Sequence, residues 1–382
     1  MKRVILLGAS GNIGNQVLDI INDDTSFHLA GVSIGKNMKR GLEILNSFST
    51  LECFFSVDEV DDEVKSKYNH VSFFSSDDGF EKFLDCVSYD FLINALVGFV
   101  GLHPTLLALS NNKTVALANK ESLVVGGELI NRLINSNKGS IIPIDSEHVA
   151  VDKCLFVDSS NVKRIILTAS GGAFRKLKRK DLAYVKSKDA LKHPTWNMGN
   201  KITIDSATMM NKCFEIIEAY YLFGNVCDRI DVLLHDESKI HSLVQYKNGL
   251  YRAEISKPDM HNPIRYAMHE RNEIITLATA HRIDDLGPFT NHRFSLRRYP
   301  LVRYAKMVIE NKGIYGCVLN ASNEVCVNAF FRDEISFLDI EKVIDIIMSD
   351  IVNIENIDYE VLKRVDYETR LKTEDLIRKL RK

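Results

Sequence analysis

The sequence predicts an α/β protein with an N-terminal doubly wound parallel sheet, a middle part with a mixed sheet and a C-terminal helical part. Three observations predict this order. Short apolar runs alternate with helical patterns over about the first 145 residues, a tight-turn signal lies at residues 248–249, and only helical patterns follow residue 299.

The first part shows strands joined by helical crossovers. The apolar run 4–7 ends at Gly8, and apolar residues then recur at helical spacing from Asn12 to Ile21. This alternation is typical of a doubly wound parallel sheet. Four further apolar runs are expected to be strands, namely 29–34, 91–95, 115–118 and 141–144.

The middle part contains a hairpin signal. Asn248-Gly249 lies between Tyr246 and Tyr251, so part of this sheet should be antiparallel. The stretch 284–298 has little apolar content and resembles a linker. Strands are expected at 165–167, 202–204, 232–234 and 243–246. The C-terminal helices are expected at 302–310, 320–331, 340–348 and 374–380.

Composition and charge exclude several classes of protein. The 382 residues are 45% hydrophobic and 26% charged, which argues against a disordered or fibrous chain, and a net charge of −2 argues against broad nucleic-acid or membrane-surface binding. The seven cysteines include no C-x-x-C pair, which favours reduced thiols over disulfides or a zinc site. No apolar run approaches the about 18 residues of a membrane span, and no signal peptide is recognisable, so we expect a cytoplasmic protein.

A glycine-rich loop joins the first predicted strand to its helix. Gly8, Gly11 and Gly14 follow the spacing G-x-x-G-x-x-G, which differs from the standard G-x-G-x-x-G. Glycines let the backbone approach a pyrophosphate, and the helix N-terminus offers free N–H groups. The loop therefore indicates a nucleotide site, although a purely structural turn would also explain the glycines.

The end of the second predicted strand indicates which nucleotide is bound. NAD-binding folds often place an acidic residue there for the ribose hydroxyls. This chain has Gly35-Lys36-Asn37 instead. A cation at this point favours the 2′-phosphate of NADPH, and the alternative is that Lys36 is an ordinary solvated surface lysine.

Two carboxylates follow the predicted strand 141–144. Asp145 and Glu147 repel each other unless a positive charge lies between them. A hard divalent cation, Mg²⁺ or Mn²⁺, is a natural partner because it prefers oxygen ligands. The alternative is a helix N-terminus, with Asp145 or Ser146 as the cap and Glu147 in the first turn.

The densest polar pattern follows at 205–218. A helix is expected from about 205 to 223, capped by one of its first two residues. Asn211, Glu215 and Glu218 then share one face, with Lys212 beside Glu215. An amide, an ammonium and carboxylates together suit a phosphate beside a metal, and the alternative is a solvated helix face.

Two further segments suggest an anion site and a cover. Ser170-Gly171-Gly172 follows a predicted strand and resembles an anion-binding nest. The polar segment after it ends in 193–199 and holds the only tryptophan, Trp196. An aromatic side chain in a polar loop is typical of a lid that closes over a ligand, and simple packing is the alternative.

Six segments in this order resemble the 1-deoxy-D-xylulose 5-phosphate reductoisomerases, enzymes of the non-mevalonate isoprenoid pathway. The resemblance covers nearly the whole chain, and 319–325 in the helical tail belongs to it. The six segments are 7–14, 118–122, 145–148, 168–172, 193–199 and 205–212.

The resemblance implies a Rossmann-like NADPH domain, an α+β catalytic domain and a C-terminal helical domain in each subunit of a homodimer. It also implies rearrangement of a small-molecule sugar phosphate to an aldehyde, which NADPH reduces to 2-C-methyl-D-erythritol 4-phosphate. The expected divisions are an NADPH-binding domain 1–145, a catalytic and dimerisation domain 146–283 with a flexible lid at about 170–200, a linker 284–299 and a helical domain 300–382.

Carried over to this chain, the resemblance implies four sets of site residues. The metal ligands for Mn²⁺ or Mg²⁺ would be Asp145, Glu147 and Glu215, and the catalytic residues would be Lys120, Glu147, Glu215 and His193. The substrate would contact Lys120, Ser146, Glu147, Ser170, His193, Trp196, Met198, Ser206, Asn211, Lys212 and Glu215. NADPH would contact Gly8, Ser10, Gly11, Asn12, Ile13, Gly35, Lys36, Asn37, Asn119, Glu121 and Gly199. Supporting roles would fall to His148, Glu218 and His241.

Some segments depart from the family's pattern. They are His235-Asp236-Glu237-Ser238, Ala173, Phe99-Val100 and the stretch 267–273, and none is a predicted metal or phosphate position. Two other functions stay open from the sequence. One is a related NADPH oxidoreductase that acts on another small phosphorylated substrate, and the other is a non-catalytic NADPH-binding regulator.

Overall fold

The computed structural model of this chain describes residues 1–190, 199–227, 229–272 and 282–381. The chain divides into two units, and each contains segments that are distant in sequence. The first unit comprises Met1–Asn119, Arg132–Asp145 and Met260–Ile274. The second comprises Lys120–Asn131, Ser146–Asp259 and Ile275–Lys382. The predicted domain boundaries stay a prediction.

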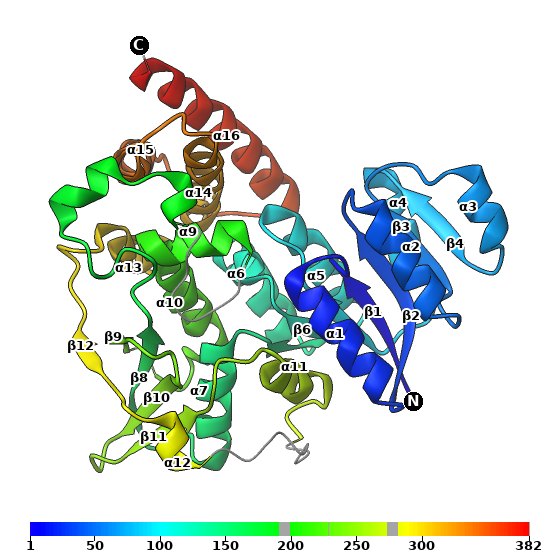
Figure 1. Cartoon of the computed structure of the whole chain (residues 1–382), viewed down its shortest axis with the longest axis horizontal. Coiled ribbons are helices and arrows are strands. Elements are labelled where there is room, and N and C mark those ends of the chain that lie inside the picture. The colour runs from blue at the N-terminus through cyan, green and yellow to red at the C-terminus, as the bar shows by residue number, and fades with distance from the viewer. Residues whose placement is uncertain (191–198, 228, 273–281, 382) are drawn as a thin grey trace. The chain divides into compact units, whose positions relative to one another are not determined.

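The first unit is built on a parallel sheet in the order β4-β3-β2-β1-β5-β6-β7 (Figure 1). The strand order reverses between β1 and β5, which is where doubly wound sheets bind ligands. The strands are β1 (Lys2–Leu7), β2 (Phe27–Ile34), β3 (Cys53–Ser56), β4 (Ser72–Ser75), β5 (Phe91–Asn94), β6 (Thr114–Leu117) and β7 (Ser140–Pro143). The predicted strands are therefore confirmed, whereas β3 and β4, of four residues each, were missed.

Helices pack the apolar side chains of this sheet into one core. Val17 and Ile20 of α1 lie there with Val4 and Leu6 of β1, all of them fully buried. A late segment returns to the same core through α11, which packs on α1. The helices of this unit are α1 (Asn12–Asp23), α2 (Met38–Ser47), α3 (Asp62–Lys67), α4 (Asp77–Asp85), α5 (Leu102–Ser110) and α11 (His261–Met268).

The second unit contains a mixed sheet in the order β11-β10-β8-β9-β12 (Figure 1). Among the described strand pairs of this sheet, only β8 and β9 are parallel, and the turn at Asn248-Gly249 joins antiparallel β10 and β11, which confirms the predicted hairpin. The stretch 284–299 contributes β12 to the edge of this sheet. The strands are β8 (Val162–Ala169), β9 (Ile230–His235), β10 (Ile240–Tyr246), β11 (Tyr251–Ile255) and β12 (Asn291–Arg293).

Helices of the second unit carry most of the predicted polar motifs. They include α6 (Lys120–Asn135), α7 (Ser146–Val157), η2 (Arg179–Tyr184), α8 (Ser187–Ala190), α9 (Asn200–Thr208), α10 (Met210–Phe223) and α12 (Ile283–Leu286). The C-terminal helices are α13 (Arg303–Asn311), α14 (Tyr315–Phe331), α15 (Phe337–Ser349) and α16 (Tyr359–Leu380), and they confirm the expected helical end of the chain.

Two local predictions are wrong at the start of the polar motif 205–218. Residues 202–204 lie in α9 and not in a strand, because Thr203 and Ile204 are buried together with Ala207 and Thr208, four residues further on, and this helical burial overrides the strand preference of β-branched residues. Neither Asp205 nor Ser206 caps a helix, since α9 already begins after Gly199. A left-handed residue, Met209 (φ 64°), then separates α9 from α10.

No helix in the described ranges has the length and apolar character needed to cross a membrane.

Candidate active site

The predicted polar stripe of α10 is buried. Glu215 and Lys212 have side chains that are 1% and 3% exposed, so the alternative of a solvated helix face is wrong. The amide of Asn211 donates a hydrogen bond to Glu215 Oε1, one turn along the helix. Lys120, the first residue of α6, donates from Nζ to Asn211 Oδ1 at 2.8 Å and to Glu215 Oε1 at 3.3 Å. Buried charges of this kind are stable only when they are paired.

A second lysine joins the carboxylates of α7 and α10. Lys212 Nζ lies 3.1 Å from Glu147 Oε1 and also contacts Glu215 Oε2. The hydroxyl of Ser146 donates to the other carboxylate oxygen of Glu147 at 2.5 Å. The structure therefore brings together Lys120, Ser146, Glu147, Asn211, Lys212 and Glu215, which the sequence analysis predicted as one site.

The donor set around these carboxylates fits a hard divalent cation. Asp145, which directly precedes α7, offers an oxygen that lies within 4.8 Å of one oxygen each of Glu147 and Glu215. Three carboxylates are the ligand type that Mg²⁺ and Mn²⁺ prefer. His148 supports this group, because its Nε2 lies 2.9 Å from the backbone oxygen of Glu215 and its Nδ1 lies 3.4 Å from Glu218 Oε2.

The predicted anion nest packs directly on α9. Gly171 and Gly172, which follow β8, have φ values of 80° and 71°, and the Gly172 N–H donates to Ser170 Oγ at 3.2 Å. A Cβ on Gly172 would lie only 2.5 Å from the backbone oxygen of Ser206. Gly172 is therefore required for the close approach of the Ser170 and Ser206 segments. The predicted residues His193, Trp196 and Met198 lie outside the described residues.

The glycine-rich loop of the first unit is tightly packed. Gly8 has φ 78°, and a Cβ on Gly14 would lie 2.3 Å from the Gly8 oxygen. The Gly8 N–H donates to Ser33 Oγ at 3.1 Å, which ties the loop to the end of β2. Gly11 is the N-cap of α1, and a glycine has no side chain that could bond the N–H groups of the first turn. The N-terminal N–H groups of α1 therefore suit an anion such as a pyrophosphate.

Residues after β2 combine an exposed lysine with a helix cap. Gly35 and Lys36 are exposed, and the side chain of Asn37 caps α2 by accepting from the Arg40 N–H at 3.2 Å. The guanidinium of Arg40 donates to Asn15 Oδ1 at 2.8 Å. Arg40 was not among the predicted residues, although it follows Asn37 by three positions, which is the spacing at which a helix N-cap accepts from a backbone N–H.

Two predicted NADPH contacts have structural partners of their own. The buried amide of Asn119 donates to the backbone oxygens of Leu96 and Gly98, both at 3.0 Å, and so holds the chain that follows β5. Glu121 accepts a hydrogen bond from Lys201 Nζ at 2.8 Å. Lys201 was missed because 202–204 was taken for a strand, whereas its spacing of four residues from Asp205 is a helical ion-pair signal.

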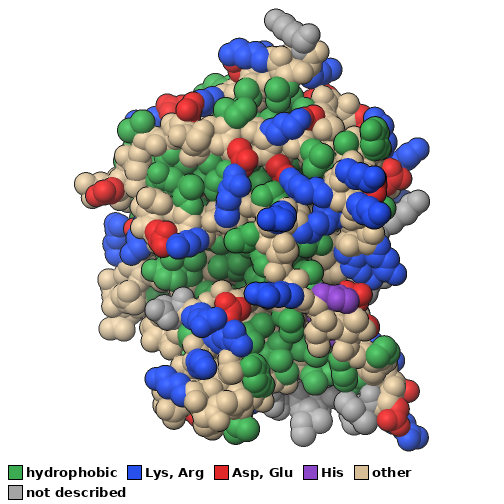
Figure 2. All heavy atoms as spheres, turned by 90° about the vertical axis from the view of Figure 1, so that its left-hand side faces the viewer, with side chains coloured by type: hydrophobic (Ala, Val, Ile, Leu, Met, Phe, Trp, Pro, Cys, Tyr) green, Lys and Arg blue, Asp and Glu red, His purple; other side chains and the backbone are tan. Residues whose placement is uncertain are grey.

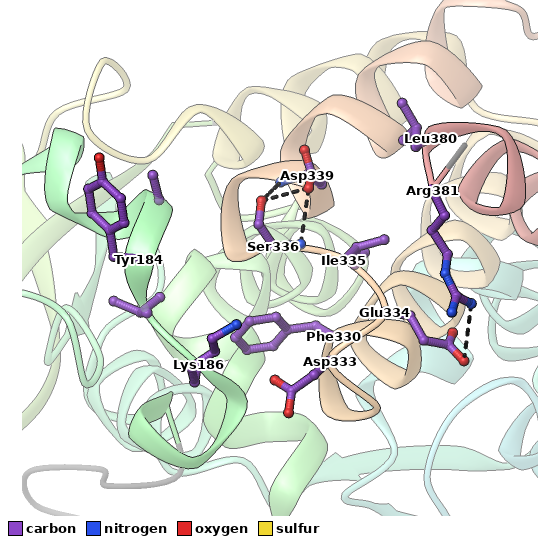
Figure 3. A pocket seen from close by; sticks show the side chains of 12 residues that line it. Tyr184, Lys186, Phe330, Asp333, Glu334, Ile335, Ser336, Asp339, Leu380 and Arg381 are labelled. Atoms are coloured by element: carbon purple, nitrogen blue, oxygen red, sulfur yellow. Dashed lines mark hydrogen bonds and ion pairs between the residues drawn. The ribbon is translucent and has the colours of Figure 1, made fainter.

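A pocket of about 350 Å³ lies elsewhere in the second unit, near η2, the turn between α14 and α15, and the end of α16 (Figure 3). Its lining includes Phe330 and Tyr184 but no residue of the predicted site. Several of its polar side chains pair with one another, as Ser336 does with Asp339, and Glu334 with Arg381 at 3.7 Å.

Comparison with known proteins gives matches along almost the whole chain. Residues 4–127 match the model of the 1-deoxy-D-xylulose 5-phosphate reductoisomerase family. Residues 141–223 and 255–372 match models of C-terminal domains of the same enzymes. A 1-deoxy-D-xylulose 5-phosphate reductoisomerase of Listeria monocytogenes is 39% identical over 99% of this chain and 100% of its own length. The chain belongs to the 1-deoxy-D-xylulose 5-phosphate reductoisomerase family.

Other reductoisomerases agree with this assignment. That of Macrococcus caseolyticus is 40% identical over 96% of this chain and 97% of its own. A solved reductoisomerase in complex with NADPH, fosmidomycin and magnesium has a TM-score of 0.92 at 29% identity and covers 100% of both chains. The enzyme of Zymomonas mobilis in complex with NADPH has a TM-score of 0.88 at 31% identity over 98% of this chain and 99% of its own. The predicted family and fold class are thus confirmed.

Proposed function

We propose that this chain catalyses the NADPH- and divalent-metal-dependent rearrangement and reduction of 1-deoxy-D-xylulose 5-phosphate to 2-C-methyl-D-erythritol 4-phosphate. One observation carries the proposal for this chain's own residues. Carboxylates of Asp145, Glu147 and Glu215 offer oxygens within 4.8 Å of one another, and Lys120 and Lys212 lie against Glu215. Full-length relatives of this chain are reductoisomerases, which supports the same reaction.

The carboxylate cluster is the metal end of the proposed site. Asp145, Glu147 and Glu215 would hold Mg²⁺ or Mn²⁺. When bound, the cation supplies Lewis-acid stabilisation of the negative charge that develops on substrate oxygens during the rearrangement. Lys120 would add a second positive charge to the same oxygens, because its ammonium already reaches Glu215 and Asn211. Ser146 orients Glu147 through its hydrogen bond.

The phosphate end would be formed by short polar side chains and one lysine. We assign Ser170, Ser206, Asn211 and Lys212 to it, together with His193. Support comes from the positive-φ backbone of Gly171 and Gly172 and from its packing on Ser206. Binding energy from a phosphate that does not react can orient the reacting end of the substrate.

The cofactor would bind to the first unit along the glycine-rich loop. The N-terminus of α1, whose N-cap is Gly11, and the exposed Lys36 support binding of a pyrophosphate and of a 2′-phosphate, respectively. NADPH supplies the hydride that reduces the aldehyde formed by the rearrangement. Asn119 would act through the backbone that it holds at Leu96 and Gly98.

The chain is further proposed to form a homodimer in the cytoplasm. Edge strand β11 exposes Tyr251 (50%) and Ile255 (39%) beside Leu250 (65%), and an unpaired edge of this kind can pair with another copy. On the face of the molecule drawn in Figure 2, hydrophobic side chains gather in several patches between lysines and arginines. All seven cysteines are free thiols, which suits a reducing compartment. Sedimentation velocity tests the dimer, and a monomer at micromolar concentration would refute it.

Consumption of NADPH in the presence of deoxyxylulose phosphate and Mn²⁺ tests the reaction. Turnover should stop when a chelator is added and return with excess Mn²⁺. Turnover that survives the chelator would refute the metal assignment. Turnover with a different sugar phosphate alone would favour a related oxidoreductase, and NADPH binding without any turnover would favour a non-catalytic regulator.

A further inference from the structure

A buried charged network joins three helices of the second unit. Lys201 of α9 donates from Nζ to Glu121 Oε1 of α6 and to Asp205 Oδ2, both at 2.8 Å. The side chains of Glu121 and Asp205 are 9% and 3% exposed. Burial alone would lower the pKa of Lys201, but the two carboxylates outweigh it and hold this pKa above its ordinary value. Lys201 is therefore a permanent positive charge between two buried acids.

Helix α14 adds an amide to this network. Asn323 is fully buried and donates from Nδ2 to Asp205 Oδ1 at 2.9 Å. Its own Oδ1 is buried without a hydrogen-bond partner among the described residues. A buried unpaired amide oxygen lowers stability, and an apolar residue of similar size would avoid that cost. Asn323 provides a hydrogen bond to Asp205, which an apolar residue of similar size could not provide.

The network anchors residues that neighbour two parts of the proposed site. Glu121 directly follows Lys120, whose ammonium reaches Glu215 at the metal end. Asp205 directly precedes Ser206, whose backbone packs on Gly172 at the phosphate end. One ammonium thus ties the start of α6 to the middle of α9.

We propose that Lys201 and Asn323 are positioning residues, which hold Lys120 and Ser206 at the spacing that the substrate requires. The inference rests on the proposed function, because it assigns these neighbours to the two ends of the same substrate. Neither Lys201 nor Asn323 need touch the substrate. They would act through the backbone of the residues that they hold. Substitution of either residue should therefore change substrate affinity more than metal affinity.

Asn323→Leu is the first test, with Asn320→Leu as its matched control. Asn320 lies one turn earlier on α14, is fully buried, and gives its amide hydrogen bond to Glu324 at 3.0 Å and not to Asp205. Asn323→Leu should raise KM for deoxyxylulose phosphate about tenfold or more, with a smaller change in kcat, and should weaken inorganic phosphate binding similarly. Asn320→Leu should leave both values near those of the wild type, whatever it does to Tm.

Exchange of the two residues tests whether restoring the hydrogen bond restores KM. Asn323→Asp places two carboxylates against each other and should also raise KM. The double variant Asp205→Asn/Asn323→Asp rebuilds the hydrogen bond with donor and acceptor exchanged, and it should return KM toward the wild-type value. Mn²⁺ affinity should stay within about twofold throughout, because the carboxylate cluster has its own contacts.

Three results would overturn the proposal: an unchanged KM and phosphate affinity in folded Asn323→Leu, an equal rise in Asn320→Leu, or no recovery in the folded double variant. Wild-type protein that never consumes NADPH with deoxyxylulose phosphate would instead refute the proposed function. Phosphate binding can be measured without turnover, so it distinguishes failure of the positioning proposal from failure of the proposed function.

Discussion

The ammonium of Lys212 lies 3.1 Å from Glu147 Oε1 and also contacts Glu215, so a lysine occupies oxygens that we assign to the metal. A divalent cation and this ammonium therefore compete for the same carboxylates. The family resemblance predicts that Lys212 binds the substrate phosphate. Both positions of Lys212 are consistent if the metal displaces its ammonium from the carboxylates and the ammonium then binds the phosphate. Metal binding would in this way promote phosphate binding.

Replacement of Lys212 by methionine should tighten metal binding while it impairs catalysis. Without the ammonium, the carboxylates of Glu147 and Glu215 lose the positive charge that they share and a cation can replace it, so the dissociation constant for Mn²⁺ should fall about tenfold. Calorimetric titration of Mn²⁺ without substrate measures this value. The control is Lys153→Met, since Lys153 pairs with Glu254 at 2.8 Å, outside this cluster. Weaker Mn²⁺ binding in Lys212→Met would show that the lysine does not compete with the cation.

Lys36→Asp should shift the cofactor preference toward NADH. Lys36 is exposed at the end of β2, where a negative charge would repel a 2′-phosphate but not a ribose hydroxyl. The ratio of kcat/KM for NADPH to that for NADH should fall by about tenfold or more. Lys39→Asp is the control, because Lys39 is also exposed and lies three residues further along the chain. Equal ratios in the two variants would leave Lys36 as an ordinary surface lysine.

The stability that Glu121 contributes should depend on pH. Burial alone would raise the pKa of Glu121, but Lys201 outweighs it and holds the pKa below its ordinary value. An acid with a depressed folded pKa stabilises the fold above its unfolded pKa of about 4.3, and this contribution is lost as the pH falls through the folded value.

The free energy of unfolding of Glu121→Gln should therefore lie below that of the wild type at neutral pH, and the gap should narrow as the pH falls below about 4.3. Urea titrations at several pH values measure the gap. Glu59→Gln serves as the control, because the side chain of Glu59 is 85% exposed and its substitution should change the free energy little. A gap that widens toward acid pH would contradict the ion pair.

Much of the fold was predictable because its signals are local. Alternating apolar runs identified β1, β2, β5, β6 and β7, and Asn248-Gly249 identified the hairpin of β10 and β11. Strands β3 and β4 were missed because runs of four residues carry too little pattern. The C-terminal helices were found by their period, although α16 begins at Tyr359, well before the predicted 374.

The site was predictable in its residue types but not in its pairing. The spacing of Asn211, Lys212 and Glu215 correctly predicted one helix face with Lys212 beside Glu215, yet nothing local shows that Lys120 lies against Glu215. Contacts between residues about 90 positions apart depend on tertiary packing. Lys201 was hidden for a different reason, since β-branched residues beside it favour a strand in isolation and a helix only when buried.

Gly172→Ala should separate a steric effect on the phosphate end from simple backbone strain. Gly172 has φ 71°, and an added Cβ would lie 2.5 Å from the Ser206 oxygen, so the nest and α9 must move apart. KM for deoxyxylulose phosphate should rise about tenfold, with Tm reduced.

Gly249→Ala is the matched control, because Gly249 has φ 89° but a Cβ there meets nothing within 4 Å. It should lower stability by about 1–2 kcal/mol through strain alone and leave KM unchanged. Both variants place an alanine at a positive φ, so both carry backbone strain. Only Gly172→Ala also adds a steric contact with the Ser206 oxygen. If Gly172→Ala kept the wild-type KM, the packing of Ser170 and Ser206 through this glycine would have no part in phosphate binding.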